Sequence, residues 1–418
     1  MKKKVLIIGN SANAYALAKK MSEYCDIYVA PGNDAMQEFA VCVDIRETVS
    51  QELLEFVLEN GIDITIPVTE AALKTDIVEL FLKNNMQIFA PGIDAARLLY
   101  DKFSAKKLMY KLGIPTPKFG IFEKQNAAND YIKNVKTPFV IKNIAPSSAV
   151  ILTSIQSSKI ILDSMFAEKY PKVLVEDYIY GTPFGFYIIT DGYNALPVGS
   201  SILYKYSLEG EGGQLTSGMG ACSPNYKLSF KHEEFLMNEV IYPTLDYLEK
   251  HNSTYMGILG VNGIITEDGN IKILGYQPFM QDVDCTGILE LIDINIYELF
   301  EACIVGSFSD EFNYIAQKNN ATVSVALLCR NTENSENVIQ NLDVLSEDTM
   351  ISYTNNVSKN KYLEYEAKTG TVMILTAIAG THSSASAKAY EELENINFKG
   401  MKYRHDICKI PVSCDMLL

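Results

Sequence analysis

The stretch YMGILGVNGIITEDGNIKILGYQPFMQDVD, residues 255–284, contains the most informative pattern in the chain. Two apolar runs, 258–266 and 271–276, flank a polar cluster that contains Asp268 and Gly269. An Asp-Gly pair between apolar runs is among the strongest short signals for a tight hairpin turn. We therefore predict a buried β-hairpin.

Polar side chains follow the second apolar run closely. Gln277, Gln281, Asp282 and Asp284 all lie within the segment 277–284. Binding residues often lie on loops that a rigid scaffold positions, so one interpretation is a ligand site that begins near residue 275. The other interpretation is an ordinary polar loop after a hairpin, and the hairpin alone does not decide between the two.

Length and composition indicate a folded protein of several domains. A chain of 418 residues is too long for one core, and 48% hydrophobic with 21% charged residues is ordinary for a folded protein. The net charge of −15 and the lack of a dense basic stripe argue against a nucleic-acid partner. No apolar run reaches the roughly 18 residues that span a bilayer, so we expect no membrane partner.

The cysteines and histidines show no metal or disulfide pattern. The eight cysteines form no CxxC pair, and MKKK at the start is followed only by a short apolar run. This pattern favours reduced thiols in the cytoplasm. The four histidines are too widely spread for a zinc site.

The first 100 residues alternate short apolar runs with helical segments. We predict strands at 5–8, 26–30, 62–67 and 87–90, and helices at 12–21, 51–59 and 70–83. This alternation is typical of a doubly wound parallel sheet. The turn GNSANA has one glycine where the dinucleotide fingerprint has three, so it does not predict a dinucleotide site.

The middle of the chain contains a candidate phosphate site. A lysine-rich helix is predicted over 101–112, and PFVIKN places Lys142 at the end of an apolar strand. A lysine there is costly unless its ammonium meets an anion, and phosphate is the natural candidate. The alternative is an edge-strand lysine that reaches water.

The segment 208–224, LEGEGGQLTSGMGACSP, predicts a glycine-rich loop whose N–H groups can approach a ligand, although many such loops are merely flexible. Helices are predicted over 233–250 and 288–304. Beyond residue 320, strands at 322–328 and 371–378 and a helix at 384–394 predict a small α+β domain.

Several segments occur in a characteristic order. They are GNSANAYALA, FAPGIDAARLLYDKFSAKKLMYKLGIPTP, PFVIK, VLVEDYIYG, TSGMGACSP, the hairpin, GTVMILTAIAG and INFKGMKYRHDI. The most specific pieces are 218–221 with Ser223-Pro224, and Tyr403-Arg404 with Asp406-Ile407. In this order the segments resemble the phosphoribosylamine–glycine ligase family, the glycinamide ribonucleotide synthetases of purine biosynthesis, over nearly the whole chain.

The resemblance implies an ATP-grasp fold, with α/β and α+β parts. An N-terminal doubly wound α/β substrate domain would span 1–101, an ATP-grasp domain 102–318 with a lid at about 118–185, and a C-terminal α+β domain 319–418. It also implies an ATP-dependent carboxylate–amine ligase in which ATP and Mg²⁺ activate glycine as an acyl phosphate for attack by phosphoribosylamine. The implied partners are small molecules, an amino acid and an amine, and the implied assembly is a monomer or dimer.

Site residues follow from the matching motifs, position by position. The residues expected to bind the nucleotide are Lys102, Lys142, Glu176, Asp177 and Tyr178. The residues expected at the substrates are Glu70, Gly218 and Gly220. Lys205 and Asp282 are expected to act in catalysis, and Gln277 and Asp282 to bind the metal.

Other positions depart from the family pattern. The Gly-Arg-Glu-His turn that holds the sugar phosphate in the family reads Ala12-Asn13-Ala14-Tyr15 here. The lid-loop aspartate and second lysine read Ile144 and Val150, and the metal-binding Glu-x-Asn with its following arginine reads Gly275, Gln277 and Phe279.

Gly275 has no side chain with which to bind a metal, which weakens the expectation of Mg²⁺. Three interpretations remain open: a working ligase of this family, an ATP-grasp ligase for another acid and amine, and a non-catalytic nucleotide-binding homologue. The second accounts for the changed sugar-phosphate turn, but not for the loss of the metal-binding glutamate.

Overall fold

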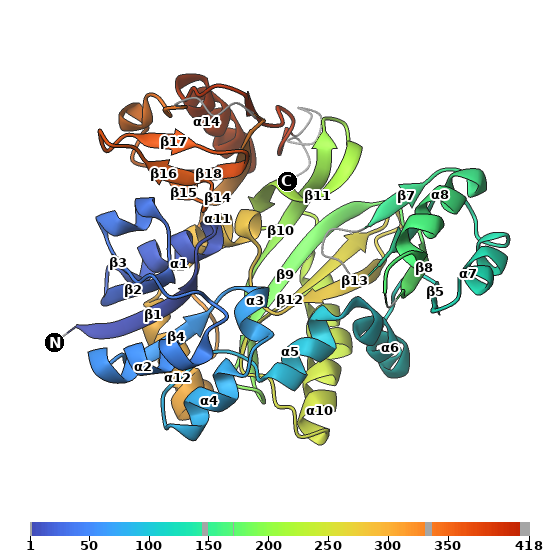
Figure 1. Cartoon of the computed structure of the whole chain (residues 1–418), viewed down its shortest axis with the longest axis horizontal. Coiled ribbons are helices and arrows are strands. Elements are labelled where there is room, and N and C mark those ends of the chain that lie inside the picture. The colour runs from blue at the N-terminus through green and yellow to red at the C-terminus, as the bar shows by residue number, and fades with distance from the viewer. Residues whose placement is uncertain (1, 144–148, 170, 331–336, 410–418) are drawn as a thin grey trace.

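The computed structural model describes residues 2–143, 149–169, 171–330 and 337–409. Its N-terminal part is a parallel sheet in the order β3-β2-β1-β4, coloured blue in Figure 1. The strands are β1 (Lys3–Gly9), β2 (Cys25–Pro31), β3 (Val41–Cys42) and β4 (Ile64–Pro67). The helices are α1 (Ala12–Met21), α2 (Ser50–Asn60), α3 (Glu70–Leu73) and α4 (Ile77–Lys83), with a 3₁₀ turn, η1, at Asp34–Glu38. The predicted doubly wound parallel sheet is confirmed.

Two details of this part differ from the prediction. The run 87–90 is not a full strand. It adds only an isolated parallel bridge to the sheet, in which Ile88 pairs with Thr65 of β4. The helix predicted over 70–83 is two helices. The Thr75 hydroxyl donates to Ala72 O at 2.7 Å and accepts from Ile77 N at 3.3 Å, so it closes one helix and opens the next.

Two helices lead from this part to a separate small sheet. They are α5 (Ile93–Tyr100) and α6 (Lys102–Leu112), and the Asp101 carboxylate caps α6. The small sheet has the order β5-β8-β6-β7, from β5 (Phe119–Phe122), β6 (Phe139–Lys142), β7 (Val150–Leu152) and β8 (Val173–Asp177). Helices α7 (Gln125–Ile132) and α8 (Ile155–Phe166) flank it, and Figure 1 shows this unit, which we call the lid sheet, at the right end of the molecule.

The central sheet runs through the rest of the molecule. Its order is β13-β12-β9-β10-β11-β14-β18-β15, with β19 (Met401–Lys402) paired to β14. The strands are β9 (Thr182–Thr190), β10 (Ala195–Leu208), β11 (Gly212–Ser223), β12 (Gly257–Ile265), β13 (Ile271–Gln277), β14 (Ala321–Cys329), β15 (Thr349–Tyr353) and β18 (Gly370–Ala379). The predicted hairpin is confirmed as β12 and β13, with Gly269 at φ +78° in the turn, where a side chain would be strained.

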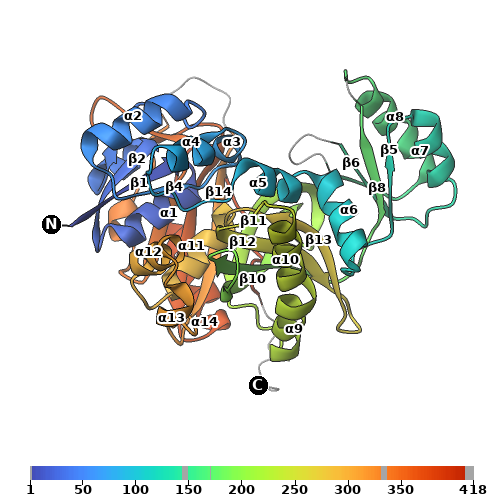
Figure 2. The same ribbon diagram turned by 90° about the horizontal axis from the view of Figure 1, so that it is seen from below.

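Helices cover both faces of the central sheet. The helix predicted over 233–250 is confirmed as α9 (Phe230–Phe235), a π turn η2 (Leu236–Ile241) and α10 (Tyr242–Lys250), which Figure 2 shows over β12. The single helix predicted over 288–304 is wrong. The chain forms α11 (Asp282–Leu291) and α12 (Ile296–Val305), because Asn295 breaks the run and its side chain caps α12 by accepting from Tyr297 N at 3.1 Å.

The C-terminal part completes the molecule beside the N-terminal sheet. It contains β14, β15 and β18, a small sheet of β16 (Val357–Lys359) and β17 (Tyr365–Ala367), and the predicted helix as α14 (His382–Asn395). Short helices α13 (Phe308–Glu311) and η3 (Leu342–Val344) fill the connections. The cysteines that the structure describes are free thiols, and none of the described helices is long and apolar enough to cross a membrane.

The predicted glycine-rich loop is wrong, because most of 208–224 is strand β11. Its residues pair with β10 on one side and β14 on the other, so the ladder uses their backbone groups. A Cβ on Gly220 would lie 2.7 Å from Ser324 O, and one on Gly218 would lie 2.7 Å from a Val283 methyl. These glycines allow close packing inside the sheet.

Candidate active site

A buried carboxylate organises the junction between the lid sheet and the central sheet. Glu176, near the end of β8, forms ion pairs with Lys142 at the end of β6 and with Lys106 of α6, whose Nζ lies 3.0 Å from Glu176 Oε2. The Glu176 and Lys106 side chains are each only 2% exposed. Burial raises the pKa of Glu176, but Lys142 and Lys106 outweigh it and hold that pKa at about 2. The carboxylate is therefore ionised and fixes both ammonium groups in place.

Lys106 also ties the lid to the hairpin. Its Nζ donates to Thr116 Oγ1 at 2.6 Å, and Thr116 Oγ1 donates to Ile273 O at 2.8 Å. The sequence alone predicts no site role for either residue. The lysine-rich helix was visible in the sequence as a source of positive charge. Only the fold shows that Lys106 is buried while its neighbour Lys107 is exposed.

Two further lysines face the same junction. Lys102 Nζ donates to Asn143 O at 3.3 Å, and burial, together with the nearby Lys142 ammonium, lowers the Lys102 pKa to about 8. Burial also lowers the pKa of Lys205 on β10. The Asp284 carboxylate opposes this lowering, and the Lys142 ammonium adds to it. Lys102, Lys106 and Lys142 thus lie near the ionised Glu176, whereas Lys205 lies near Lys142 and the Asp284 carboxylate.

The segment after β8 connects the lid sheet to the central sheet. Asp177 N donates to Lys118 O at 2.9 Å, which fixes the end of β8. The Tyr178 hydroxyl lies 2.8 Å from that of Tyr206 on β10, and the Tyr178 ring packs edge-on against Tyr180. The predicted nucleotide-binding residues Lys102, Lys142, Glu176, Asp177 and Tyr178 therefore lie along one junction.

The predicted metal ligands are already engaged in the structure. Asp282 Oδ1 accepts from Asn13 N at 2.9 Å, so this carboxylate caps helix α1. Gln277 Oε1 accepts from Gln281 Nε2 at 2.9 Å. Among the residues that the structure describes, no group of three or more His, Cys, Asp or Glu side chains could hold a metal ion.

Asp284 is the other carboxylate at this strand end. It is fully buried in the first turn of α11, where it accepts hydrogen bonds from the Tyr187 hydroxyl at 2.6 Å and from the Ser201 hydroxyl. Burial raises its pKa, and the two hydroxyl donors and Lys205 oppose the rise. Asp282 and Asp284, the two carboxylates that follow β13, therefore both have hydrogen-bond partners within the protein.

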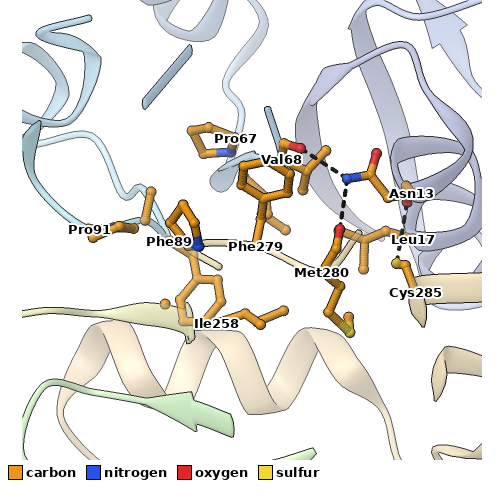
Figure 3. A pocket seen from close by; sticks show the side chains of 14 residues that line it. Asn13, Leu17, Pro67, Val68, Phe89, Pro91, Ile258, Phe279, Met280 and Cys285 are labelled. Atoms are coloured by element: carbon orange, nitrogen blue, oxygen red, sulfur yellow. Dashed lines mark hydrogen bonds between the residues drawn. The ribbon is translucent and has the colours of Figure 1, made fainter. Parts of the chain in front are cut away.

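The residues of the turn at the start of α1, 12–15, are buried. Ala12 and Ala14 are fully buried, and Asn13 Nδ2 donates to Val68 O and to Met280 O, each at 3.0 Å (Figure 3). The Tyr15 ring packs edge-on against Phe39 and Tyr353. This turn joins the N-terminal part to α11 and to the C-terminal part.

A small pocket lies beside that turn, between the ends of β4 and β13. Its lining is almost entirely apolar, as Figure 3 shows for Phe89, Ile258, Phe279 and Met280. Asn13 is its one amide side chain, and its amide group is already bonded within the protein. The lining contains no cation, so a phosphate group would find no charged partner there.

The remaining predicted residues lie at other places. Glu70 opens α3 and pairs with Lys74 at 2.6 Å on a partly exposed surface, and its charge partly opposes the lowering of the Lys102 pKa by burial. Gly218 and Gly220 lie within β11, and Lys205 lies on the neighbouring β10. Val150 lies in β7, whereas Ile144 is outside the described residues.

Family models match three consecutive parts of the chain. They are the N domain of phosphoribosylglycinamide synthetase at residues 3–98, its ATP-grasp (A) domain at 100–285 and its C domain at 331–410. A phosphoribosylamine–glycine ligase of Neisseria meningitidis is 30% identical over 97% of this chain and 98% of its own length. The chain belongs to the phosphoribosylglycinamide synthetase family. This is a family of ATP-dependent ligases of purine biosynthesis, and the predicted family and fold class are confirmed.

Further relatives agree with this assignment. A phosphoribosylamine–glycine ligase of Caldanaerobacter subterraneus is 29% identical over 97% of this chain and 99% of its own length. The crystal structure of such a ligase from Thermotoga maritima matches with a TM-score of 0.80 at 22% identity, over 97% of this chain and all of the other. A biotin carboxylase domain from Hydrogenobacter thermophilus, in complex with MgADP, matches with a TM-score of 0.73 at 15% identity, over 96% and 92% of the two chains. These structures share the ATP-grasp fold.

Proposed function

We propose that this protein binds ATP between the lid sheet and the central sheet and uses it to join a carboxylic acid to an amine. The observation that carries the proposal is the group of Lys102, Lys106 and Lys142 around the buried Glu176 carboxylate, with Lys205 on the neighbouring sheet close enough to Lys142 to feel its charge. Positive charge held in a partly dry junction favours a polyphosphate, because a charge-assisted contact there is stronger than in water. ATP, when bound, supplies the phosphoryl group that activates the acid.

Each residue of the junction has a distinct task in this proposal. Glu176 fixes the Lys142 and Lys106 ammonium groups, so that they need not reorganise when the nucleotide arrives. Lys102 and Lys205 contribute further positive charge from α6 and β10. Thr116, which precedes the lid sheet, hydrogen-bonds to both Lys106 and Ile273 O of β13. These contacts fix the position of the lid sheet relative to the central sheet. We also propose that the protein works on small molecules in the cytoplasm, as a monomer or dimer.

The test is calorimetry with ATP and ADP, followed by an assay of ADP release with glycine and other amino acids. Lys142→Ala should weaken nucleotide binding about tenfold or more, because one charge-assisted contact contributes roughly 1.5–3 kcal/mol. Lys133→Ala is the matched control, since Lys133 lies in an exposed pair at the lid surface. Absence of nucleotide binding to the wild type would refute the proposed function.

A second candidate concerns the amine. The relatives are named for phosphoribosylamine, but the corresponding turn here is buried, and the adjoining pocket is apolar and contains no cation. A sugar phosphate carries nearly two negative charges and needs N–H and cationic partners. We infer that a less charged amine is the better substrate.

This inference has its own experiment, separate from nucleotide binding. ADP release with glycine should be faster with uncharged amines than with phosphoribosylamine. Formation of glycinamide ribonucleotide at an ordinary enzymatic rate, or growth of a purine-requiring strain that carries this gene, would restore the sugar phosphate as substrate. Neither result would affect the proposed nucleotide site.

A further inference from the structure

Asn262 of β12 carries a buried oxygen that has no hydrogen-bond donor among the described residues. The residue is only 6% exposed, and its Oδ1 is enclosed without a partner. Leaving such an atom unpaired costs about 1–3 kcal/mol, so native proteins rarely do it without a reason. A partner from outside the chain would supply that reason.

The strand register shows which face of the central sheet carries this amide. Asn262 pairs directly with Gly185 on β9 and with Gly275 on β13. Directly opposite residues of antiparallel strands point to the same face. A Cβ on Gly185 would lie 3.1 Å from Ser201 Oγ and 3.3 Å from Asp284 Oδ1. Asn262 therefore belongs to the face that carries Asp284, opposite the face whose core contains Val261 and Tyr276.

The space beside Asn262 is open. A Cβ on Gly275 would meet no atom within 4 Å, so nothing in the described protein fills the place of a side chain there. The register between β12 and β13 also shifts just after Asn262. Bulges of this kind recur near active sites, where they change the direction of a side chain. The amide thus adjoins the place from which the strand-end glutamate projects in the family.

We propose that Asn262 supplies its amide oxygen to the divalent cation that accompanies the nucleotide. The oxygen that binds the cation then comes from residue 262 on β12. This residue pairs directly with residue 275 on β13, where the family has its glutamate. Mg²⁺ prefers hard oxygen ligands, and an amide oxygen is one, although it lacks the charge of a carboxylate. Gln277, also on this face, carries a second amide oxygen at the strand end, which already accepts a hydrogen bond from Gln281 Nε2. The proposal rests on the proposed nucleotide site.

The consequence is a cation held mainly by the nucleotide itself. With neutral protein ligands, Mg²⁺ strengthens nucleotide binding less than it would beside a glutamate. The lysine cluster then supplies most of the affinity. Removing Asn262 should reduce the contribution of Mg²⁺ without disturbing the lysines.

The experiment measures ADP binding by calorimetry with Mg²⁺ and with a chelator, so that no turnover is needed. The measured quantity is the ratio of the two dissociation constants. Asn262→Ala should reduce the gain in affinity from Mg²⁺ by about tenfold, at least as much as the loss of a residue that only supports a metal ligand. Asn262→Asp should increase that gain, and should weaken binding without metal because its carboxylate repels the phosphates. Asn270→Ala, in the exposed turn of the same hairpin, is the matched control.

Two further measurements separate a ligand from a structural residue. The electron paramagnetic resonance spectrum of Mn²⁺-ADP should change between wild type and Asn262→Ala. Asn262→Ala should not lower the unfolding temperature of the free protein, since the lost oxygen had no partner and its removal ends the cost of burying it. Gly275→Glu, introduced into Asn262→Ala, should restore the Mg²⁺ effect because the space there is open.

The outcomes are distinct. If Mg²⁺ increases the affinity for ADP equally in Asn262→Ala and in the wild type, the inference is overturned and the proposed nucleotide site remains. If the wild type binds ADP with equal affinity with and without Mg²⁺, the inference is likewise overturned. If the wild type binds no nucleotide under either condition, the inference and the proposed function fail together.

Discussion

The two junctions at the central sheet differ in chemistry. At the lid junction, the buried Glu176 carboxylate forms ion pairs with the Lys142 and Lys106 ammonium groups. At the N-terminal junction, Asp282 and Asn13 close the start of α1 with internal hydrogen bonds, and an apolar pocket adjoins them. We infer that the lid junction binds the nucleotide and that the N-terminal junction accepts a second substrate other than a sugar phosphate.

The largest expected effect concerns the lid junction. Glu176→Gln keeps the shape of the side chain but leaves the buried Lys106 ammonium without its counter-charge. Breaking a buried pair from one side costs about 3–5 kcal/mol, so the free energy of unfolding in urea should fall by that amount. The exposed Glu123→Gln should have no measurable effect, since Glu123 lies 4.0 Å from Lys172 at the surface. Equal stability of Glu176→Gln and wild type would show that the ion pairs do not organise this junction.

Acid should weaken the same junction. The Glu176 pKa of about 2 lies below its ordinary value of 4.5, so its contribution is complete above pH 4.5 and is lost as the pH falls towards 2. The shift corresponds to roughly 3 kcal/mol. Urea unfolding across this pH range should show the loss in the wild type and a smaller one in Glu176→Gln. Parallel pH profiles for the two proteins would contradict the assignment.

The N-terminal junction should respond to shape rather than to polarity. Tyr15→Ala removes a buried ring that packs against Phe39 and Tyr353, and should lower the free energy of unfolding by about 3 kcal/mol. Tyr15→Phe keeps the ring, so it should change the free energy of unfolding by less than about 1.5 kcal/mol and should leave the rate of ADP release nearly unchanged. Loss of ADP release in Tyr15→Phe would give the hydroxyl a role at the substrate and break the contrast between the two junctions.

A smaller effect is a change in protonation when the nucleotide binds. The Lys102 pKa of about 8 means that this group is roughly half charged at pH 8, and a bound phosphate should complete its protonation. Calorimetry at pH 8 in buffers of different ionisation enthalpy should show uptake of roughly half a proton per ATP. Lys102→Arg should abolish the uptake, because arginine stays charged. Equal enthalpies in all buffers for the wild type would contradict the depressed pKa.

The sequence predicted the fold better than it predicted the site. Apolar periodicity and the Asp268-Gly269 turn are local signals, so the hairpin and the parallel sheet were predictable. The pairing of Asp282 with the start of α1 joins residues 269 positions apart, and no local pattern shows that this carboxylate is already used. The glycine-rich segment was misread for a related reason. Its glycines are needed where strands approach closely, which composition alone does not separate from a loop.

The smallest expected effect tests whether Asp282 is a helix cap or a metal ligand. As a cap it accepts from Asn13 N, and an asparagine in its place could accept the same hydrogen bond. Asp282→Asn would lose the attraction between the carboxylate and the helix dipole, about 0.3–1 kcal/mol, but would also remove the cost of burying that charge, which raises the Asp282 pKa. The two changes oppose each other, so the free energy of unfolding in urea should change by less than about 1 kcal/mol. The gain in ADP affinity from Mg²⁺ should stay the same. A metal ligand would behave differently, because its loss would reduce that gain about tenfold or more. That result would return Asp282 to the metal site and show that the N-terminal junction opens when the nucleotide binds.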